Sequence, residues 1–216
     1  MATQPKKYRP SNARSAGRPA YVKRKVIPPG RRKNIDYRTR EHLTQDEVNA
    51  LMEAAGKTGR HPHRDRTLIL LAFRHALRVS ELVSLRWSQV DFRNGILHVT
   101  RLKNGIPSTH PLHGPELRAL RKLSRDYPET PYVFVSERGG PLTVDSVQKI
   151  VRRAGEKADL PFPVHPHQLR HACGFHLANQ GIDTRAIQLY LGHKSITHTA
   201  RYTELASSRF DDFWGD

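Results

Sequence analysis

Apolar side chains recur at helical spacing only from residue 41 onward, and this boundary limits most strongly what the chain can fold into. Thr44 and Glu47 have the spacing of a capping box, and the apolar residues after them recur at intervals of three and four. With 216 residues, the chain has room for one ordinary domain and an extension. We therefore place a single folded domain over residues 41–216.

Residues 1–40 have a very different composition. They hold 13 Lys and Arg against one acidic residue, Asp36, so they carry +12 of the chain's formal charge of +17. Five prolines and few large apolar side chains leave too little surface to bury against the entropy of ordering. We expect a disordered arm that binds DNA phosphates, with a solubilising tail as the alternative. The residues expected to contact DNA are Lys6, Lys7, Arg9, Lys23, Arg24, Lys25, Arg31, Arg32 and Lys33.

The charge of the whole chain indicates a polyanionic partner. There are 37 Lys and Arg against 20 Asp and Glu, which favours nucleic acid first and an anionic membrane surface second. The membrane is disfavoured because the sequence has no run of about 18 apolar residues and no basic segment interleaved with bulky apolar side chains. The absence of a secretory signal pattern and the single cysteine, Cys173, suit a reducing cytoplasm. The apolar neighbours of Cys173 indicate a buried thiol.

The sequence predicts a mainly α (α+β) fold, a helical bundle with a small β-hairpin or sheet. Residues 95–112 alternate as strands do and break at Asn104-Gly105, which predicts a hairpin turn. Asp183 is expected to cap a helix, and Gly155, Gly181 and Gly192 to end the helices before them. The helices are expected at residues 44–55, 65–77, from Ser80, at 115–127, 143–155, 167–181 and 183–191, and around Tyr202.

Six polar residues lie at the ends of these elements, and their combination is more informative than any one of them. The two arginines, the lysine and the two histidines among them can each be explained more simply as a solvated charge or a surface histidine. The sixth, a tyrosine on a short polar helix, has few apolar neighbours at helical spacing, which is unusual for a core residue. Two Arg, one Lys, two His and one Tyr are what attack on a phosphodiester without a metal ion requires. The six are Arg78, Lys103, His167, Arg170, His193 and Tyr202.

A metal site is the alternative use of the histidines. His165, His167 and His171 have a suitable spacing, but no cysteine or acidic ligand accompanies them. We therefore expect no metal and no other cofactor.

The joint pattern resembles the tyrosine recombinase (phage integrase) family. The motifs that carry the resemblance are ALRVSELVSLRW, the lysine in RLKNG, HPHQLRH with its H-x-x-R, LGH, and Tyr202 nine residues after His193. Their order and spacing agree over residues 41–205. The short length and RLKNGIPSTHPL are most similar to the fimbrial phase-variation recombinases, which invert a promoter-bearing DNA segment. The resemblance implies the catalytic-domain fold of this family.

The resemblance also implies a role for each of the six residues. Tyr202 would attack a scissile phosphate and form a 3′-phosphotyrosyl bond. Arg78 and Arg170 would grip the non-bridging oxygens, because permanent charge and bidentate geometry suit that task. Lys103 would protonate the leaving 5′-oxygen.

Further positions follow from the same resemblance. His167 would assist proton transfer and His193 would hydrogen-bond the phosphate. Glu81, which would orient Arg78 or His167, and His171 would support the site. Because the phosphotyrosyl bond conserves the energy of the cleaved bond, rejoining would need neither nucleotide nor metal.

The implied partners are double-stranded DNA with paired recognition sites and further copies of this chain. We expect a monomer or dimer in solution, a homotetramer on DNA, and accessory DNA-bending proteins in addition. The apolar C-terminal residues Phe210, Phe213 and Trp214 are expected to dock on their own domain or on the next protomer. Inversion and integration or excision remain open, and the alternative functions are a non-catalytic DNA-binding regulator and a type IB topoisomerase.

Overall fold

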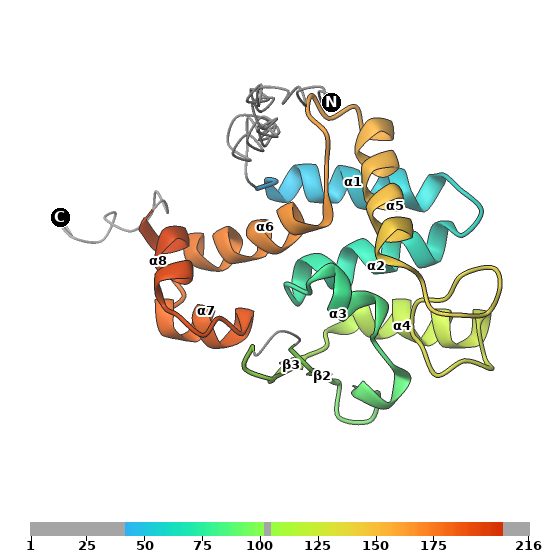
Figure 1. The fold of residues 1–216 in the computed structure, drawn as a ribbon, viewed down its shortest axis with the longest axis horizontal. Helices are drawn as coiled ribbons and strands as arrows, with labels where there is room; N and C mark the ends of the chain where they lie inside the picture. The colour runs from blue at the N-terminus through green and yellow to red at the C-terminus, as the bar shows by residue number, and fades with distance from the viewer. Residues whose placement is uncertain (1–41, 102–104, 205–216) are drawn as a thin grey trace, which may run out of the picture. The chain divides into compact units, whose positions relative to one another are not determined.

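The computed structural model describes residues 42–101 and 105–204, which belong to one compact unit, Arg38–Asp216 (Figure 1). The basic arm, Lys103 and the C-terminal aromatic residues lie outside the described residues. What the sequence predicts for them stays a prediction.

Helices dominate the described residues, as the sequence predicts. The helices are α1 Gln45–Lys57, α2 Pro62–Arg74, α3 Val79–Val83, the 3-10 helix η2 Trp87–Gln89, α4 Gly114–Asp126, α5 Val144–Lys157, α6 Pro166–Asn179, α7 Thr184–Leu191 and α8 Thr197–Glu204. A small antiparallel sheet has the order β1-β2-β3, with β1 Val90–Asp91, β2 Ile96–Val99 and β3 Ser108–Pro111. The mainly α class with a small β element is therefore confirmed.

Local hydrogen bonds explain several helix ends. The Glu47 backbone N–H donates to the Thr44 hydroxyl and the Thr44 N–H donates back to the Glu47 carboxylate, so the predicted capping box is confirmed. Asp183 accepts from the Ala186 N–H at the start of α7. Gly192 ends the same helix at φ +67°, a left-handed conformation that favours glycine.

The prediction that Gly155 ends a helix is wrong. Gly155 lies inside α5, which continues to Lys157. A Cβ at this position would lie 2.5 Å from the side chain of Val164. The glycine is therefore needed for close packing between α5 and the segment before α6, and not for a turn.

The hairpin turn expected at Asn104-Gly105 falls partly outside the described residues, which leave out Asn104, so the turn itself stays a prediction. Val99 pairs with Ser108, so the strands end several residues before that dipeptide and the connection spans residues 100–107. The side chain of Arg101 turns into the domain, where only 5% of the residue is exposed. Arg101 thus continues the inward positions of Leu97 and Val99, which are both buried.

The core surrounds α2, whose residues Leu68, Ile69 and Leu71 are fully buried. This helix packs against α1, α4 and α6, and α6 in turn packs against α7 and α8 (Figure 1). Cys173 on α6 is buried, and burial raises the pKa of its thiol to about 12, as expected of a structural cysteine. Within the described residues, no helix is long and apolar enough to cross a membrane.

Candidate active site

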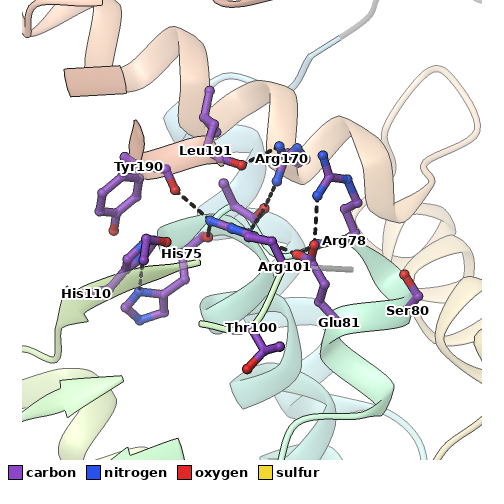
Figure 2. Close-up of polar contacts among 12 residues, drawn as sticks. His75, Arg78, Ser80, Glu81, Thr100, Arg101, His110, Arg170, Tyr190 and Leu191 are labelled. Carbon is purple, nitrogen blue, oxygen red and sulfur yellow. Dashed lines mark hydrogen bonds and ion pairs between the residues drawn. The ribbon is translucent and has the colours of Figure 1, made fainter. Parts of the chain in front are cut away.

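Arg170 lies in the interior of the domain, on the second turn of α6. It is 2% exposed. Its guanidinium donates to the Ala76 carbonyl, between α2 and α3, and to the Leu191 carbonyl at the end of α7, the latter at 2.6 Å (Figure 2). Burial, followed by the neighbouring charges of Arg78 and Arg101, lowers the pKa of Arg170 to about 10.

Arg78 and Glu81 form a hydrogen-bonded pair at the start of α3. The Arg78 backbone N–H and its Nη1 both donate to the Glu81 carboxylate, at 2.9 and 2.7 Å. The Glu81 side chain is 2% exposed and that of Arg78 is 27% exposed, so the guanidinium of Arg78 reaches the surface. Of the two residues that Glu81 was expected to orient, the structure pairs it with Arg78.

Arg101 is the residue of this site that the sequence did not indicate. Its guanidinium donates to the Glu81 carboxylate at 2.9 Å and to the Tyr190 carbonyl at 2.6 Å. Two longer bonds, each 3.3 Å, reach the carbonyls of His75 and Ala76 (Figure 2). The place of Arg101 two residues after Val99 puts it on the buried face of the strand pattern, and this was the available signal. An arginine beside a predicted hairpin turn normally means a solvated charge, so the position was not singled out.

Three guanidinium groups therefore gather around one carboxylate. Burial raises the pKa of Glu81, but hydrogen bonds from Arg78 and attraction to Arg101 outweigh it, so its net pKa lies below the ordinary value. With Glu81 ionised, Arg78, Arg101 and Arg170 leave this cluster with two positive charges in excess. Uncompensated charge in a partly buried site is unfavourable unless an anion completes it. The arrangement can hold a phosphate.

Tyr202 is a buried residue, which contradicts the sequence interpretation of its surroundings. It is 2% exposed and packs edge-on against Phe175 of α6. Its hydroxyl forms a 2.9 Å hydrogen bond with Nδ1 of His171. A Cβ on Gly174 would lie 2.8 Å from the tyrosine ring, so this glycine makes room for it. The apolar neighbours come from α6 and not from α8, which is why spacing along α8 alone did not reveal them.

Burial also controls the ionisation of the two groups in that hydrogen bond. Burial raises the pKa of the Tyr202 phenol, and the positive charge of Arg170 offsets part of this increase. Burial, with the charges of His167 and Arg170, lowers the pKa of His171 to about 3. At neutral pH a protonated phenol therefore faces a neutral imidazole that can accept a hydrogen bond.

His193 follows the left-handed residue that ends α7. Its Nδ1 forms a 2.8 Å hydrogen bond with the hydroxyl of Thr199, which is fully buried on α8. The ring lies 6.3 Å from that of Tyr202, centroid to centroid, at a small interplanar angle. Burial, then Arg170 and Arg78, lowers the pKa of His193 to about 3. The His193 ring is thus close to the arginines and to Tyr202.

His167 is exposed on the otherwise buried first turn of α6, with its ring edge-on to His171 at a centroid distance of 4.4 Å. It reaches Tyr202 through His171 in this structure. The metal alternative for His165, His167 and His171 finds no support in the described residues, where no three His, Cys, Asp or Glu side chains are arranged to hold an ion. Five of the six predicted residues thus lie in one region, and Lys103 lies outside the described residues.

The site residues described above lie together on a mainly helical domain, an arrangement that can be compared with known protein families. Residues 41–209 match the sequence model of the Phage integrase family. The chain therefore belongs to the phage integrase family of tyrosine recombinases.

Individual members of this family have sequences similar to that of this chain. The chain is 43% identical over 184 residues to the type 1 fimbriae regulatory protein FimB of Escherichia coli K12, covering 83% of this chain and 92% of FimB. It is also 43% identical over 183 residues to FimE of the same strain, covering 81% and 91%. The tyrosine recombinase XerA of Pyrococcus furiosus is 36% identical over 174 residues, covering 79% of this chain and 59% of XerA.

Solved structures have the same fold. The crystal structure of XerA recombinase matches with a TM-score of 0.69 at 28% identity, covering 80% of this chain and 63% of that one. A lambda integrase dimer bound to a COC′ core site matches with a TM-score of 0.62 at 26% identity, covering 81% and 50%. The chain thus spans about half to two thirds of the length of these solved recombinases.

Proposed function

We propose that this tyrosine recombinase cleaves and rejoins DNA at specific sites through a 3′-phosphotyrosyl intermediate on Tyr202. The observation that carries the proposal is the excess positive charge of Arg78, Arg101 and Arg170 around Glu81, beside a tyrosine hydroxyl. A phosphodiester supplies the anion that this cluster lacks. The lambda integrase neighbour, which is bound to a core site, supports DNA as the partner.

In the proposed step, the Tyr202 oxygen attacks phosphorus and the bond from phosphorus to the 5′-oxygen breaks. The leaving 5′-oxygen takes a proton from Lys103, and the phenol gives up its own proton. Arg78 and Arg170 meet the charge on the non-bridging oxygens, and His193 adds a hydrogen bond. Rejoining is the reverse attack by a 5′-hydroxyl.

The burial of Tyr202 adds a requirement to this mechanism. At 2% exposure its hydroxyl is not accessible to a DNA phosphate, so we infer that α8 moves when DNA binds. His171 holds the phenol until then through a 2.9 Å hydrogen bond and lies within reach to take its proton. The negative charge of a bound phosphate favours the protonated form of a neighbouring imidazole, so His171 becomes a better proton acceptor when DNA is present. We assign His167, which lies beside it, to the same proton transfer.

We further propose that the outcome is inversion of a DNA segment. The similarity to FimB and FimE over nearly their whole length favours inversion over integration or excision. The proposed assembly is a homotetramer on paired sites, assisted by accessory DNA-bending proteins. A nucleoid-bound location in the cytoplasm follows from this substrate.

The test uses suicide DNA substrates, in which a nick lets the 5′-hydroxyl strand diffuse away after cleavage. Wild-type protein should form an SDS-resistant adduct on duplexes bearing defined inverted repeats, and Tyr202→Phe should bind the same DNA without forming one. An adduct with Tyr202→Phe would refute the nucleophile. Equal adduct formation on random duplex would instead indicate topoisomerase chemistry. If no adduct formed on any duplex, the protein would be a DNA-binding regulator without this activity.

A further inference from the structure

Arg101 occupies the junction of three segments that each carry a proposed active-site residue. Through Glu81 it is linked to Arg78, because both guanidinium groups donate to the same carboxylate. Through Ala76 it is linked to Arg170, because the Ala76 carbonyl accepts from both. Figure 2 shows Arg101 close to Glu81, Arg78, Arg170 and Tyr190.

The third link runs to α7 and His193. Arg101 donates to the Tyr190 carbonyl, one residue before the Leu191 carbonyl that binds Arg170. Tyr190 is itself fixed, since its ring stacks on His110 at a centroid distance of 3.8 Å and its hydroxyl donates to a carbonyl of α2 at 2.8 Å. The acceptor that Arg101 uses on α7 is therefore held from two other elements.

Close packing fixes the stem of Arg101 as well. A Cβ added to Gly192, the residue before His193, would lie 2.8 Å from Cγ of Arg101. A Cβ added to Gly105 would lie 2.7 Å from Cβ of Arg101. The two glycines let the hairpin and the end of α7 close on the arginine, so a small displacement of Arg101 displaces both.

Stability alone does not account for this placement. The side chain of Arg101 has no exposed surface, and burial lowers its pKa. Its Nε is buried and finds no acceptor among the described residues, which costs free energy. Burying a third guanidinium beside two others also adds repulsion.

We propose that Arg101 is a positioning residue that sets the spacing of the two phosphate-binding arginines, Arg78 and Arg170, by holding Glu81, the Ala76 carbonyl and the end of α7 together. It acts through these residues and does not itself touch the phosphate. This inference rests on the proposed function of the site.

The test compares cleavage of an ordinary suicide substrate with that of one bearing a methylphosphonate at the scissile position. Replacing a charged non-bridging oxygen by methyl removes the charge that the arginines serve. Arg101→Lys keeps a cation beside Glu81 but cannot reach the carbonyls of Ala76, His75 and Tyr190 together. We expect it to slow cleavage of the phosphodiester by about 10²-fold, the usual effect of misplacing catalytic groups by about 1 Å. On the methylphosphonate diastereomers the loss should shrink to about threefold or less.

Arg64→Lys is the matched control. Arg64 is also buried, is paired with Asp65 at 2.8 Å and donates to the Val135 carbonyl at 2.8 Å, away from the site. It should cleave both substrates at wild-type rates. Gly105→Ala is a second variant that displaces Arg101 without changing charge and should show a smaller defect of the same kind. If Arg101→Lys does not melt cooperatively, and so is not properly folded, Gly105→Ala replaces it in the comparison of the two substrates.

Each outcome bears on the proposal separately from the proposed function. Equal losses on the two substrates, or wild-type rates on both, would overturn the positioning role. Failure of the wild-type protein to form a Tyr202 adduct would overturn the proposed function instead. A double-mutant comparison with Arg78→Ala adds a check, since residues acting through one carboxylate should show non-additive losses.

Discussion

Replacing Glu81 by Gln should destabilise the domain strongly, because among the described residues this carboxylate is the anion that pairs with Arg78 and Arg101. Its side chain is 2% exposed and accepts from Arg78 and Arg101. Removing one member of a buried ion pair costs about 3–5 kcal/mol. Glutamine keeps the shape and one acceptor, so we expect about 3 kcal/mol, the low end of that range. For a domain of this size, that corresponds to a fall in Tm of about 6–12 °C.

The pH dependence provides a second, independent measurement. Because the folded-state pKa of Glu81 lies below its ordinary value of 4.5, its stabilisation is complete above that pH and is lost as the pH falls through the folded pKa. The difference in Tm between wild type and Glu81→Gln should therefore be constant near neutrality and narrow below pH 4.5. Thermal unfolding by circular dichroism from pH 7 downward measures both.

Glu53→Gln is the control for this series. Glu53 is 65% exposed and pairs with Lys57 on the surface of α1, and exposed pairs of this kind contribute little. Its Tm should stay essentially unchanged. A stabilising, ionised Glu81 would be refuted if Glu81→Gln melted within about 2 °C of wild type at pH 7, less than the shift expected from a loss of about 1 kcal/mol, or if the difference did not narrow on acidification.

Three further perturbations test other parts of the site. Gly174→Ala would place a Cβ 2.8 Å from the Tyr202 ring, and such overpacking costs about 1–3 kcal/mol. Denaturant titration should therefore show a lower free energy of unfolding, and the tyrosine emission should change. Arg170→Ala should slow adduct formation on suicide DNA by two to three orders of magnitude, in keeping with about 3–4 kcal/mol per preorganised donor, while EDTA should leave wild-type cleavage unchanged. Deleting residues 1–40 should flatten the dependence of log K on log salt by several units, since each neutralised phosphate contributes about −0.9, with a much smaller change in the ratio of specific to non-specific binding.

Contrary results would be informative in each case. Unchanged stability and emission in Gly174→Ala would mean that Tyr202 does not pack there in solution. Inhibition by EDTA that added zinc or magnesium reverses would support a metal-dependent reaction. An unchanged salt slope would show that the arm does not touch DNA, and a collapse of specificity with little change in slope would show that it reads bases.

Local sequence patterns predicted those features that depend on neighbours within a few residues. The capping box at Thr44, the Asp183 cap and the left-handed Gly192 each need only hydrogen bonds or backbone angles inside one turn. The joint spacing of Arg78, His167, Arg170, His193 and Tyr202 was enough to indicate the family. Gly155 was misread because glycine serves a tight contact as well as a helix end, and the sequence does not distinguish the two.

Tertiary structure decided which groups share a partner. Tyr202 is buried because α6 supplies Phe175, His171 and the space at Gly174, about thirty residues earlier in the chain. Arg101 belongs to the site because the carbonyls of Ala76 and Tyr190, separated from it by 25 and 89 residues, converge on its guanidinium. Periodicity reports which face of an element is apolar, whereas the partners of a buried charge depend on how distant elements pack. The sequence therefore determined the chemistry available to this protein, and the packing of α2, α3, α6, α7 and the hairpin determined how its charges are held.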